Sequence, residues 1–131
     1  MLLAKPTQDC HDRGVRYLAR KLRDGGFEVI FANFLLAEDV VAMALQEDVD
    51  AIGVSSSSGG HMAVFEDLMK GLSEHGAGDM LVLGGGIIPG DDAEQLARIG
   101  VARVFGPGTS HDDVTRFIRE RVAQRRTAVT R

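Results

Sequence analysis

The fold of this chain is organised around one stretch, Lys5-Pro6-Thr7-Gln8-Asp9-Cys10-His11-Asp12-Arg13-Gly14. It follows a short apolar run that predicts a strand over residues 2–5. It leads into a pattern of apolar residues at helical spacing, which predicts a helix over residues 12–24 that ends at Gly25-Gly26. The quoted stretch is therefore expected to form the loop of a strand–loop–helix unit.

The same alternation of a short apolar run and a helical pattern continues along the chain. The predicted strands cover residues 2–5, 27–32, 51–55, 80–83 and 102–105, and the predicted helices cover residues 12–24, 37–48, 61–74, 91–99 and 111–124. Strands that alternate with helices predict an α/β fold with a parallel sheet and helices on both faces. The compact five-stranded solution is the flavodoxin-like order 2-1-3-4-5. We expect one domain over residues 1–126 and a frayed tail over residues 127–131.

The composition is typical of a globular domain, since 44% of the 131 residues are hydrophobic and 26% are charged. A chain of this length can bury a sizeable core. The single cysteine, Cys10, excludes an internal disulfide and favours a reducing compartment. No run of 18 apolar residues and no signal peptide is present, so we expect a cytoplasmic protein without a membrane segment.

The charge is spread unevenly along the chain. Residues 1–114 carry 9 basic and 18 acidic side chains, whereas residues 115–131 carry six arginines and one glutamate. An acidic body argues against a nucleic-acid-binding protein. The arginines could contact an acidic partner, but we favour a solvated last helix whose cations suit its C-terminal dipole.

Four loops rich in glycine, serine or polar residues follow predicted strands. In such sheets, ligands bind beyond the carboxyl ends of the strands, near the first and third. Each loop also has a purely structural explanation: Asp9 and His11 as a helix cap, the serines and glycines as turns, and Thr109 or Ser110 as the cap of the last helix. Their shared location at one edge favours a ligand site. The loops are residues 5–14, 55–60, 84–86 and 106–109.

Asp9 and His11 stand two residues apart, where an extended loop lets the carboxylate orient the imidazole ring. That arrangement supports a metal-ligating histidine. A receiver domain would need a phosphorylatable aspartate where Ser55 stands, and a flavodoxin would need aromatic residues to stack on a flavin. A zinc hydrolase would need more than two ligands. Among the remaining histidines, only His61 is expected near this edge.

Four motifs stand in register along the chain: Asp9-X-His11-X-X-Gly14, Val54-Ser55-Ser56-Ser57-Ser58-Gly59-Gly60-His61, Gly85-Gly86-Ile87-Ile88-Pro89 and Val104-Phe105-Gly106-Pro107-Gly108-Thr109. Together they resemble the motifs of the cobalamin-binding domain of the methylmalonyl-CoA mutase family. The corresponding family segments are Asp-X-His-X-X-Gly, Val-Ser-Ser-Leu-Ala-Ala-Gly-His, Gly-Gly-Val-Ile-Pro and Val-Phe-Gly-Pro-Gly-Thr.

The resemblance implies a role for each residue of the first loop. His11 would be the lower axial ligand of the cobalt, in place of dimethylbenzimidazole, in the base-off, His-on mode. Asp9 would accept a hydrogen bond from the other nitrogen of His11, and Lys5 would pair with Asp9. The other cofactor-binding residues implied in this loop are Asp12, Arg13 and Gly14.

The resemblance also implies that the displaced nucleotide tail of the cofactor enters a slot between the first helix and the sheet. Ser55 would donate a hydrogen bond to the benzimidazole nitrogen. Gly85 and Gly86 would let the backbone lie close to the tail. The further cofactor-binding residues implied are Ser57, Gly59, Phe105, Gly106, Gly108 and Thr109.

Three positions differ from the family pattern. Thr7 and Cys10 stand where the family commonly has glycine, which predicts a stiffer loop with a thiol beside the ligand. Ser57 stands where the family has leucine, which predicts a more polar tail pocket.

By this resemblance the chain is the cobalamin-binding subunit of an adenosylcobalamin-dependent acyl-CoA mutase, an isomerase inactive without a large acyl-CoA-binding subunit. Methylmalonyl-CoA is the leading substrate, and the small subunit of a 2-hydroxyisobutyryl-CoA mutase is the close alternative. No residue of the chain is expected to act as an acid or base on substrate. A non-catalytic corrinoid carrier or sensor is the alternative from another class, although such proteins usually add an N-terminal helical bundle.

Overall fold

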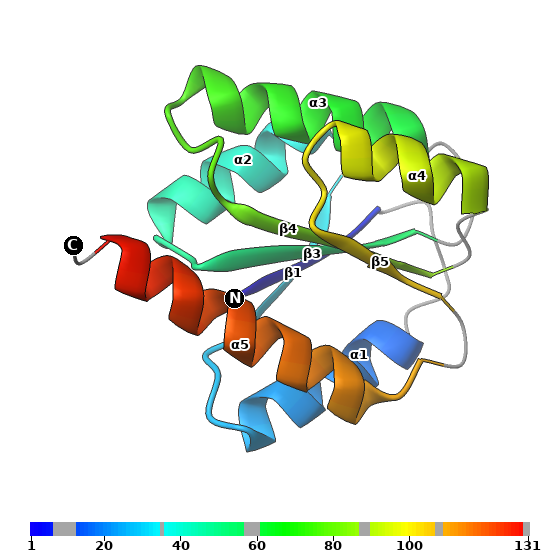
Figure 1. Ribbon diagram of the computed structural model, residues 1–131, viewed down its shortest axis with the longest axis vertical. Helices are drawn as coiled ribbons and strands as arrows, with labels where there is room; N and C mark the ends of the chain where they lie inside the picture. Colours follow the sequence, from blue (N-terminus) through cyan, green and yellow to red (C-terminus); the bar gives the residue numbers. More distant parts are fainter. Residues whose placement is uncertain (7–12, 35, 57–60, 87–89, 107–108, 130–131) are drawn as a thin grey trace.

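A computed structural model describes residues 1–6, 13–34, 36–56, 61–86, 90–106 and 109–129. These residues form strands and helices in strict alternation (Figure 1). The strands are β1 (Leu2–Pro6), β2 (Ile30–Phe34), β3 (Ala51–Ser56), β4 (Leu81–Gly86) and β5 (Arg103–Phe105). The helices are α1 (Arg13–Asp24), α2 (Ala37–Gln46), α3 (His61–Glu74), α4 (Gly90–Arg98) and α5 (His111–Val129).

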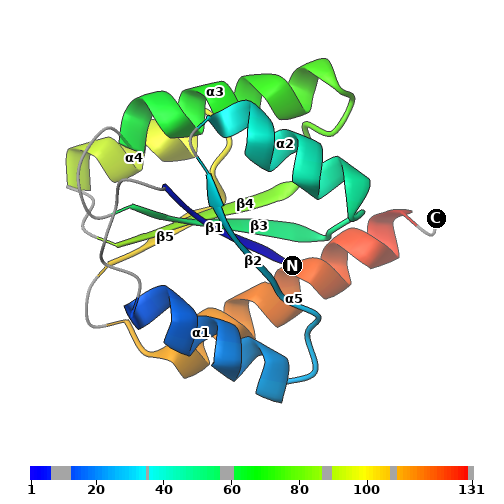
Figure 2. The same ribbon diagram turned by 180° about the vertical axis from the view of Figure 1, so that it is seen from behind.

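The strands form one parallel sheet in the order β2-β1-β3-β4-β5. The flavodoxin-like topology predicted from the sequence is therefore confirmed. Helices α2, α3 and α4 cover one face of the sheet, and α1 and α5 cover the other (Figures 1 and 2). The strand order reverses between β1 and β3, which makes the carboxyl edge there the expected place for a ligand.

Successive residues of each strand feed two separate cores because strand side chains alternate between faces. On the α2–α4 side, Leu2 and Ile52 are buried together with Phe65 of α3. On the α1–α5 side, Leu3 is buried together with Ile118 of α5. The carboxyl ends of the strands therefore belong to a sheet that is packed on both faces.

The second strand begins later than the sequence predicts, at Ile30 instead of residue 27. The N–H group of Phe27 donates to the carbonyl oxygen of Leu22 at 3.0 Å, and Arg23 Nη2 donates to that of Val29 at 3.1 Å. Phe27 and Val29 pack against the α1–α5 core. These two residues are therefore apolar because they pack the segment between α1 and β2 against the core. A run of apolar residues in the sequence does not distinguish such a segment from a strand.

The last helix runs to Val129, past the predicted end at residue 124 and into the segment predicted to fray. Arg116 forms an ion pair with Asp113 at 3.6 Å, and Arg119 Nη2 donates to the carbonyl oxygen of Gly25 at 3.0 Å. These contacts within the chain favour the solvated-helix interpretation of the arginines. None of the described helices is long and apolar enough to cross a membrane.

The three glycines at residues 84–86 were predicted to form a loop, and this prediction is wrong. They are the last residues of β4, where Gly84 pairs with Val54 and Gly85 with Ser55. A Cβ atom added at Gly84 would lie 2.9 Å from Cζ of Phe65. The ring of Phe65 therefore occupies the place of a side chain at Gly84, which lets glycine stand inside a strand.

Gly84→Ala is expected to lower the free energy of unfolding by about 1–3 kcal/mol, because the added methyl group overpacks a rigid aromatic contact. Denaturant unfolding followed by circular dichroism measures the change. Gly85→Ala is the matched control, since its added Cβ would meet the carbonyl oxygen of Phe105 at an ordinary 3.8 Å. Equal losses of stability in the two variants would contradict this account of Gly84.

Candidate functional site

The carboxyl edge of the sheet carries a row of three neighbouring residues on adjacent strands. Ser55 of β3 pairs with Gly85 of β4, and Gly85 pairs with Phe105 of β5. We call these three residues the edge row. Lys5 of β1 stands at the same level, since it follows Ala4, whose partner on β3 is Val54. Four residues predicted from separate motifs are thus brought to one level of the sheet.

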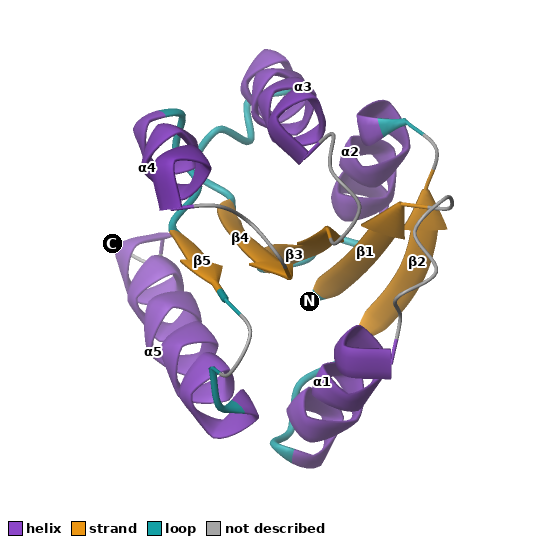
Figure 3. Cartoon of the chain, turned by 90° about the vertical axis from the view of Figure 1, so that its right-hand side faces the viewer, coloured by secondary structure: helices purple, strands orange, loops and turns teal. Residues whose placement is uncertain are grey.

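The edge row faces the side of the sheet that α1 and α5 cover. Val54 and Phe65 belong to the α2–α4 core, whereas Phe105 belongs to the α1–α5 core. Because strand side chains alternate, Ser55 and Gly85 share the face of Phe105. Figure 3 views the sheet from the edge where the strands end, with α1 and α5 on one side and the other helices opposite. A ligand over the edge row would therefore lie beside these two helices.

Gly85 differs from Gly84 in what surrounds it. Among the described residues, the nearest atom to a Cβ added at Gly85 is the carbonyl oxygen of Phe105, at 3.8 Å. No described side chain fills the space in front of Gly85, whereas Phe65 fills it at Gly84. Neither glycine has a positive φ, so no backbone strain demands glycine at either position. Glycine at position 85 is thus not required by the described packing, and it leaves room for a ligand against the backbone.

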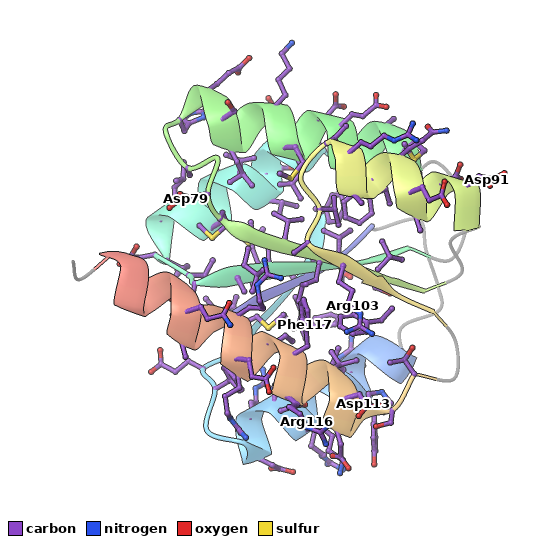
Figure 4. All side chains as sticks on the ribbon, in the orientation of Figure 1. Asp79, Asp91, Arg103, Asp113, Arg116 and Phe117 are labelled. Atoms are coloured by element: carbon purple, nitrogen blue, oxygen red, sulfur yellow. The ribbon has the colours of Figure 1, made fainter. Side chains whose placement is uncertain are left out.

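Phe105 closes the row at the outer strand and is held firmly. Its ring packs edge-on against Phe117 of α5, with centroids 5.6 Å apart and an interplanar angle of 78°. Arg103 lies over both rings, 4.9 Å from the centroid of Phe105 and 5.2 Å from that of Phe117. Figure 4 labels Arg103 and Phe117. Arg121, which like Phe117 belongs to α5, has its Cζ atom 5.4 Å from the centroid of the Phe117 ring. These stacked cations and rings make Phe105 a rigid wall.

The sequence-based interpretation missed the roles of Arg103 and Phe117. A signal for Arg103 existed, because it stands two residues before Phe105 and strand residues two apart share a face. Phe117 lies on another element, so only the tertiary structure brings it to Phe105.

The start of α5 lies at the same edge. The sequence predicted either Thr109 or Ser110 as the cap of this helix, and the structure shows that it is Ser110. The Ser110 hydroxyl accepts a hydrogen bond from the N–H group of Asp113 at 3.1 Å, which makes Ser110 the cap. Thr109 is half-buried, and its N–H group donates to the carbonyl oxygen of Gly106 at 3.2 Å. Thr109 is thereby left available for the predicted role beside the edge row.

A second histidine lies at this edge, contrary to the expectation that only His61 would be near it. His111 is the first residue of α5, and its ring packs edge-on against Tyr17 of α1, with centroids 4.7 Å apart and an interplanar angle of 65°. His75 follows the far end of α3, with Nδ1 2.8 Å from the carbonyl oxygen of Gly71. The position of His111 was missed because the histidine belongs to no recognisable motif.

Part of the predicted site lies outside the described residues, so its proposed geometry stays a prediction. Of the first loop, the structure describes the backbone of Lys5 in β1 and of Arg13 and Gly14 at the start of α1. Gly86 ends β4. The predicted residues outside the described ranges are Asp9, His11, Asp12, Ser57, Gly59 and Gly108.

A cavity of about 580 Å³ lies at the opposite edge of the sheet, where the strands begin. Its lining includes Met1, Phe27, Asp50 and Arg119. This location is the reverse of the edge at which parallel α/β sheets bind ligands, so the cavity is separate from the candidate site.

Comparison with known proteins assigns the sequence to a described family. The model of the B12 binding domain matches residues 1–114. The 2-hydroxyisobutanoyl-CoA mutase small subunit of Aquincola tertiaricarbonis is 44% identical over 126 residues, which cover 95% of this chain and 93% of the relative. The mitochondrial methylmalonyl-CoA mutase of Homo sapiens is 43% identical over 110 residues, which cover 83% of this chain and only 15% of the relative. The chain therefore spans nearly the whole of one relative and a small part of the other.

Solved structures show the same fold at low sequence identity. A cobalamin-binding protein from Desulfitobacterium hafniense DCB-2 matches with a TM-score of 0.75 at 18% identity, over 91% of this chain and 56% of that chain. A CheY-like receiver domain from Methanospirillum hungatei JF-1 matches with a TM-score of 0.70 at 13% identity, over 97% of both chains. At these identities the likeness concerns the fold alone.

Proposed function

This chain belongs to the B12-binding domain family, and we propose that it is the cobalamin-binding subunit of an adenosylcobalamin-dependent acyl-CoA mutase. The observation that carries this proposal is the 44% identity to a mutase small subunit over 93% of that relative. Methylmalonyl-CoA mutases contain a matching segment within a much longer chain. The proposal therefore combines two findings: the matching family is the B12 binding domain, and both relatives are acyl-CoA mutases.

The residues of the edge row fit the proposed cofactor. The space in front of Gly85, which no side chain of the described residues fills, suits a flat group lying against the backbone, and half-buried Ser55 offers a hydroxyl beside it. Phe105 provides an apolar wall. We define the tail site as the proposed position of the nucleotide tail over Ser55, Gly85 and Phe105. These three residues would bind and orient the tail and exclude water from it.

The proposed lower ligand assembly lies in the loop between β1 and α1. His11 would hold the cobalt, Asp9 would orient the imidazole ring, and Lys5 would balance the charge of Asp9. This proposal is supported by the level of Lys5 on β1, which is the level of the edge row. When bound, adenosylcobalamin supplies the organic radical that starts the rearrangement. The chain's own residues hold and orient the cofactor, and none acts on substrate.

The identity of the substrate depends on the proposed large subunit. The segment from Val104 to Thr109 led us to expect methylmalonyl-CoA first. The similarity to the 2-hydroxyisobutanoyl-CoA mutase small subunit, which extends over nearly all of that relative, favours 2-hydroxyisobutanoyl-CoA instead. We therefore propose 2-hydroxyisobutanoyl-CoA as the first substrate to test, with methylmalonyl-CoA as the second candidate.

A reconstitution experiment tests the division of labour. The purified chain with adenosylcobalamin is expected to show no mutase turnover, because the acyl-CoA site would lie on the large subunit. Addition of a large subunit of 2-hydroxyisobutanoyl-CoA mutase, obtained by pull-down with this chain, is expected to produce turnover. The measurement is product formation from each of the two acyl-CoA substrates. Turnover by the chain without a large subunit would overturn the proposal.

A further inference from the structure

Two glycines of β4 stand near phenylalanine rings, and the two rings are placed differently. On the α2–α4 side, Cζ of Phe65 lies 2.9 Å from a Cβ added at Gly84, so this ring fills the space of a side chain. On the α1–α5 side, Phe105 is the direct partner of Gly85 on the neighbouring strand. Its carbonyl oxygen, at 3.8 Å, is the one described atom near a Cβ added at Gly85. The ring of Phe105 therefore lies outside the space in front of Gly85.

This position of the Phe105 ring needs a physical cause. An aromatic side chain on a neighbouring strand can lie over a glycine and supply the apolar contact that the glycine lacks. Such cover is favourable because it removes apolar surface from water. Phe105 stands directly beside Gly85 and shares its face of the sheet, yet its ring does not cover Gly85. Other contacts must therefore hold the ring elsewhere.

Arg103 and Phe117 supply those contacts. The ring of Phe117 meets that of Phe105 edge-on, with centroids 5.6 Å apart. Cζ of Arg103 lies 4.9 Å from the Phe105 centroid and 5.2 Å from the Phe117 centroid, so one guanidinium group joins the two rings. Within the described part of the chain, Arg103 has no hydrogen-bond or ion-pair partner. The two rings are thus the described interactions of this arginine.

The place of β5 in the sheet makes the contact with Arg103 important. β5 is the outermost strand and has three residues, Arg103 to Phe105. It pairs with β4 on one side and with no described strand on the other, so no neighbouring strand confines the Phe105 side chain from outside. Arg103 is exposed, whereas Phe105 is 8% exposed, because the long arginine side chain covers the ring and keeps its charge in water.

We infer that Arg103 is a positioning residue that keeps the tail site open before the cofactor binds. This inference rests on the proposed function. With Arg103 in place, the Phe105 ring stays against Phe117 and leaves the space in front of Gly85 to the nucleotide tail. Without Arg103, the ring would cover Gly85 in a fraction of the molecules, and these could not admit a tail. Arg103 thereby favours corrinoids that carry a tail, and it acts through Phe105.

The test compares the rates at which the full chain binds and releases adenosylcobalamin and cobinamide, a corrinoid without the nucleotide tail, prepared with the same adenosyl group. For Arg103→Ala, association of adenosylcobalamin is expected to slow by about 2- to 30-fold, the range that corresponds to loss of a cation–π contact. Its dissociation rate is expected to stay unchanged, because the ring can cover Gly85 only while the tail is absent. Both rates for cobinamide are expected to stay unchanged. Stopped-flow absorbance of the corrin measures all four rates.

Two further comparisons separate positioning from a general loss of structure. In a Phe105→Leu chain, which has no ring to cover Gly85, Arg103→Ala is expected to add no further effect. Arg119→Ala is the matched control, since Arg119 lies over another ring, 5.8 Å from the centroid of Phe27, and both residues line the cavity at the opposite edge. This variant is expected to leave all four rates unchanged. Circular dichroism checks that each variant is folded.

The outcomes distinguish the inference from the function on which it rests. If the unchanged chain binds no adenosylcobalamin, the proposed function fails. If it binds, the positioning role of Arg103 is overturned by any of three results. Arg103→Ala may not be the cause if association of adenosylcobalamin is unaltered, if association of cobinamide slows equally, or if the effect persists in the Phe105→Leu chain.

Discussion

Gly85→Val is expected to weaken adenosylcobalamin binding about 5- to 150-fold while the chain stays folded. The valine side chain would project from β4 over the edge row, where no described side chain lies. Overpacking of this kind costs about 1–3 kcal/mol, which corresponds to that range of dissociation constants. Equilibrium titration followed by corrin absorbance measures the affinity.

Two comparisons make this result specific to the tail site. Cobinamide has no tail that could collide with the valine side chain, so its affinity is expected to be the same for Gly85→Val and for the unchanged chain. Thermal unfolding of the cofactor-free variant is expected to match that of the unchanged chain, because glycine at this position is not required by the described packing. Unaltered adenosylcobalamin affinity in the folded variant would show that the tail lies elsewhere.

His11→Ala is expected to abolish the His-on absorption spectrum of bound adenosylcobalamin. The affinity is expected to fall at least about 10-fold, the lower limit seen when a residue that supports a metal ligand is removed. The physical reason is that alanine has no nitrogen to coordinate cobalt in place of the displaced base. Absorbance and electron paramagnetic resonance of the reduced cofactor report the nature of the lower ligand.

A matched histidine variant controls for a general change in charge or stability. His75 follows α3 at the opposite edge, where its ring contacts the carbonyl oxygen of Gly71. His75→Ala is therefore expected to keep both the spectrum and the affinity. A His-on spectrum that survives in His11→Ala would remove His11 as the ligand and point to another histidine, such as His111 at the same edge.

The positions of strands and helices could be predicted well because local spacing reflects local burial. The helix at His61–Glu74 was predicted at its observed bounds, and its inward residues Phe65, Leu68 and Leu72 are fully buried. The second strand was misplaced because Phe27 and Val29 are apolar for a different reason, namely packing after α1. Apolar character alone does not reveal which partner an apolar residue has.

Part of the candidate site was predictable for a similar reason. Parallel strands all end at one edge, so motifs that follow Ser55, Gly85 and Phe105 had to meet there. The roles of Arg103 and His111 were not predictable, because their ring partners, Phe117 and Tyr17, come from other elements.

The sequence by itself determined the parallel α/β fold class and the edge of the sheet at which the functional motifs gather. It could do so because the alternation of strands with helices and the spacing of apolar residues are properties of neighbouring residues. Only the tertiary structure decided which glycine serves packing and which leaves room for a ligand. Gly84 and Gly85 are adjacent and identical in the sequence, yet an added Cβ at Gly84 would collide with Phe65, whereas at Gly85 the nearest described atom is the carbonyl oxygen of Phe105 at 3.8 Å. That difference arises from side chains distant in sequence, and it makes Gly85 the position at which the proposed cofactor site is best tested.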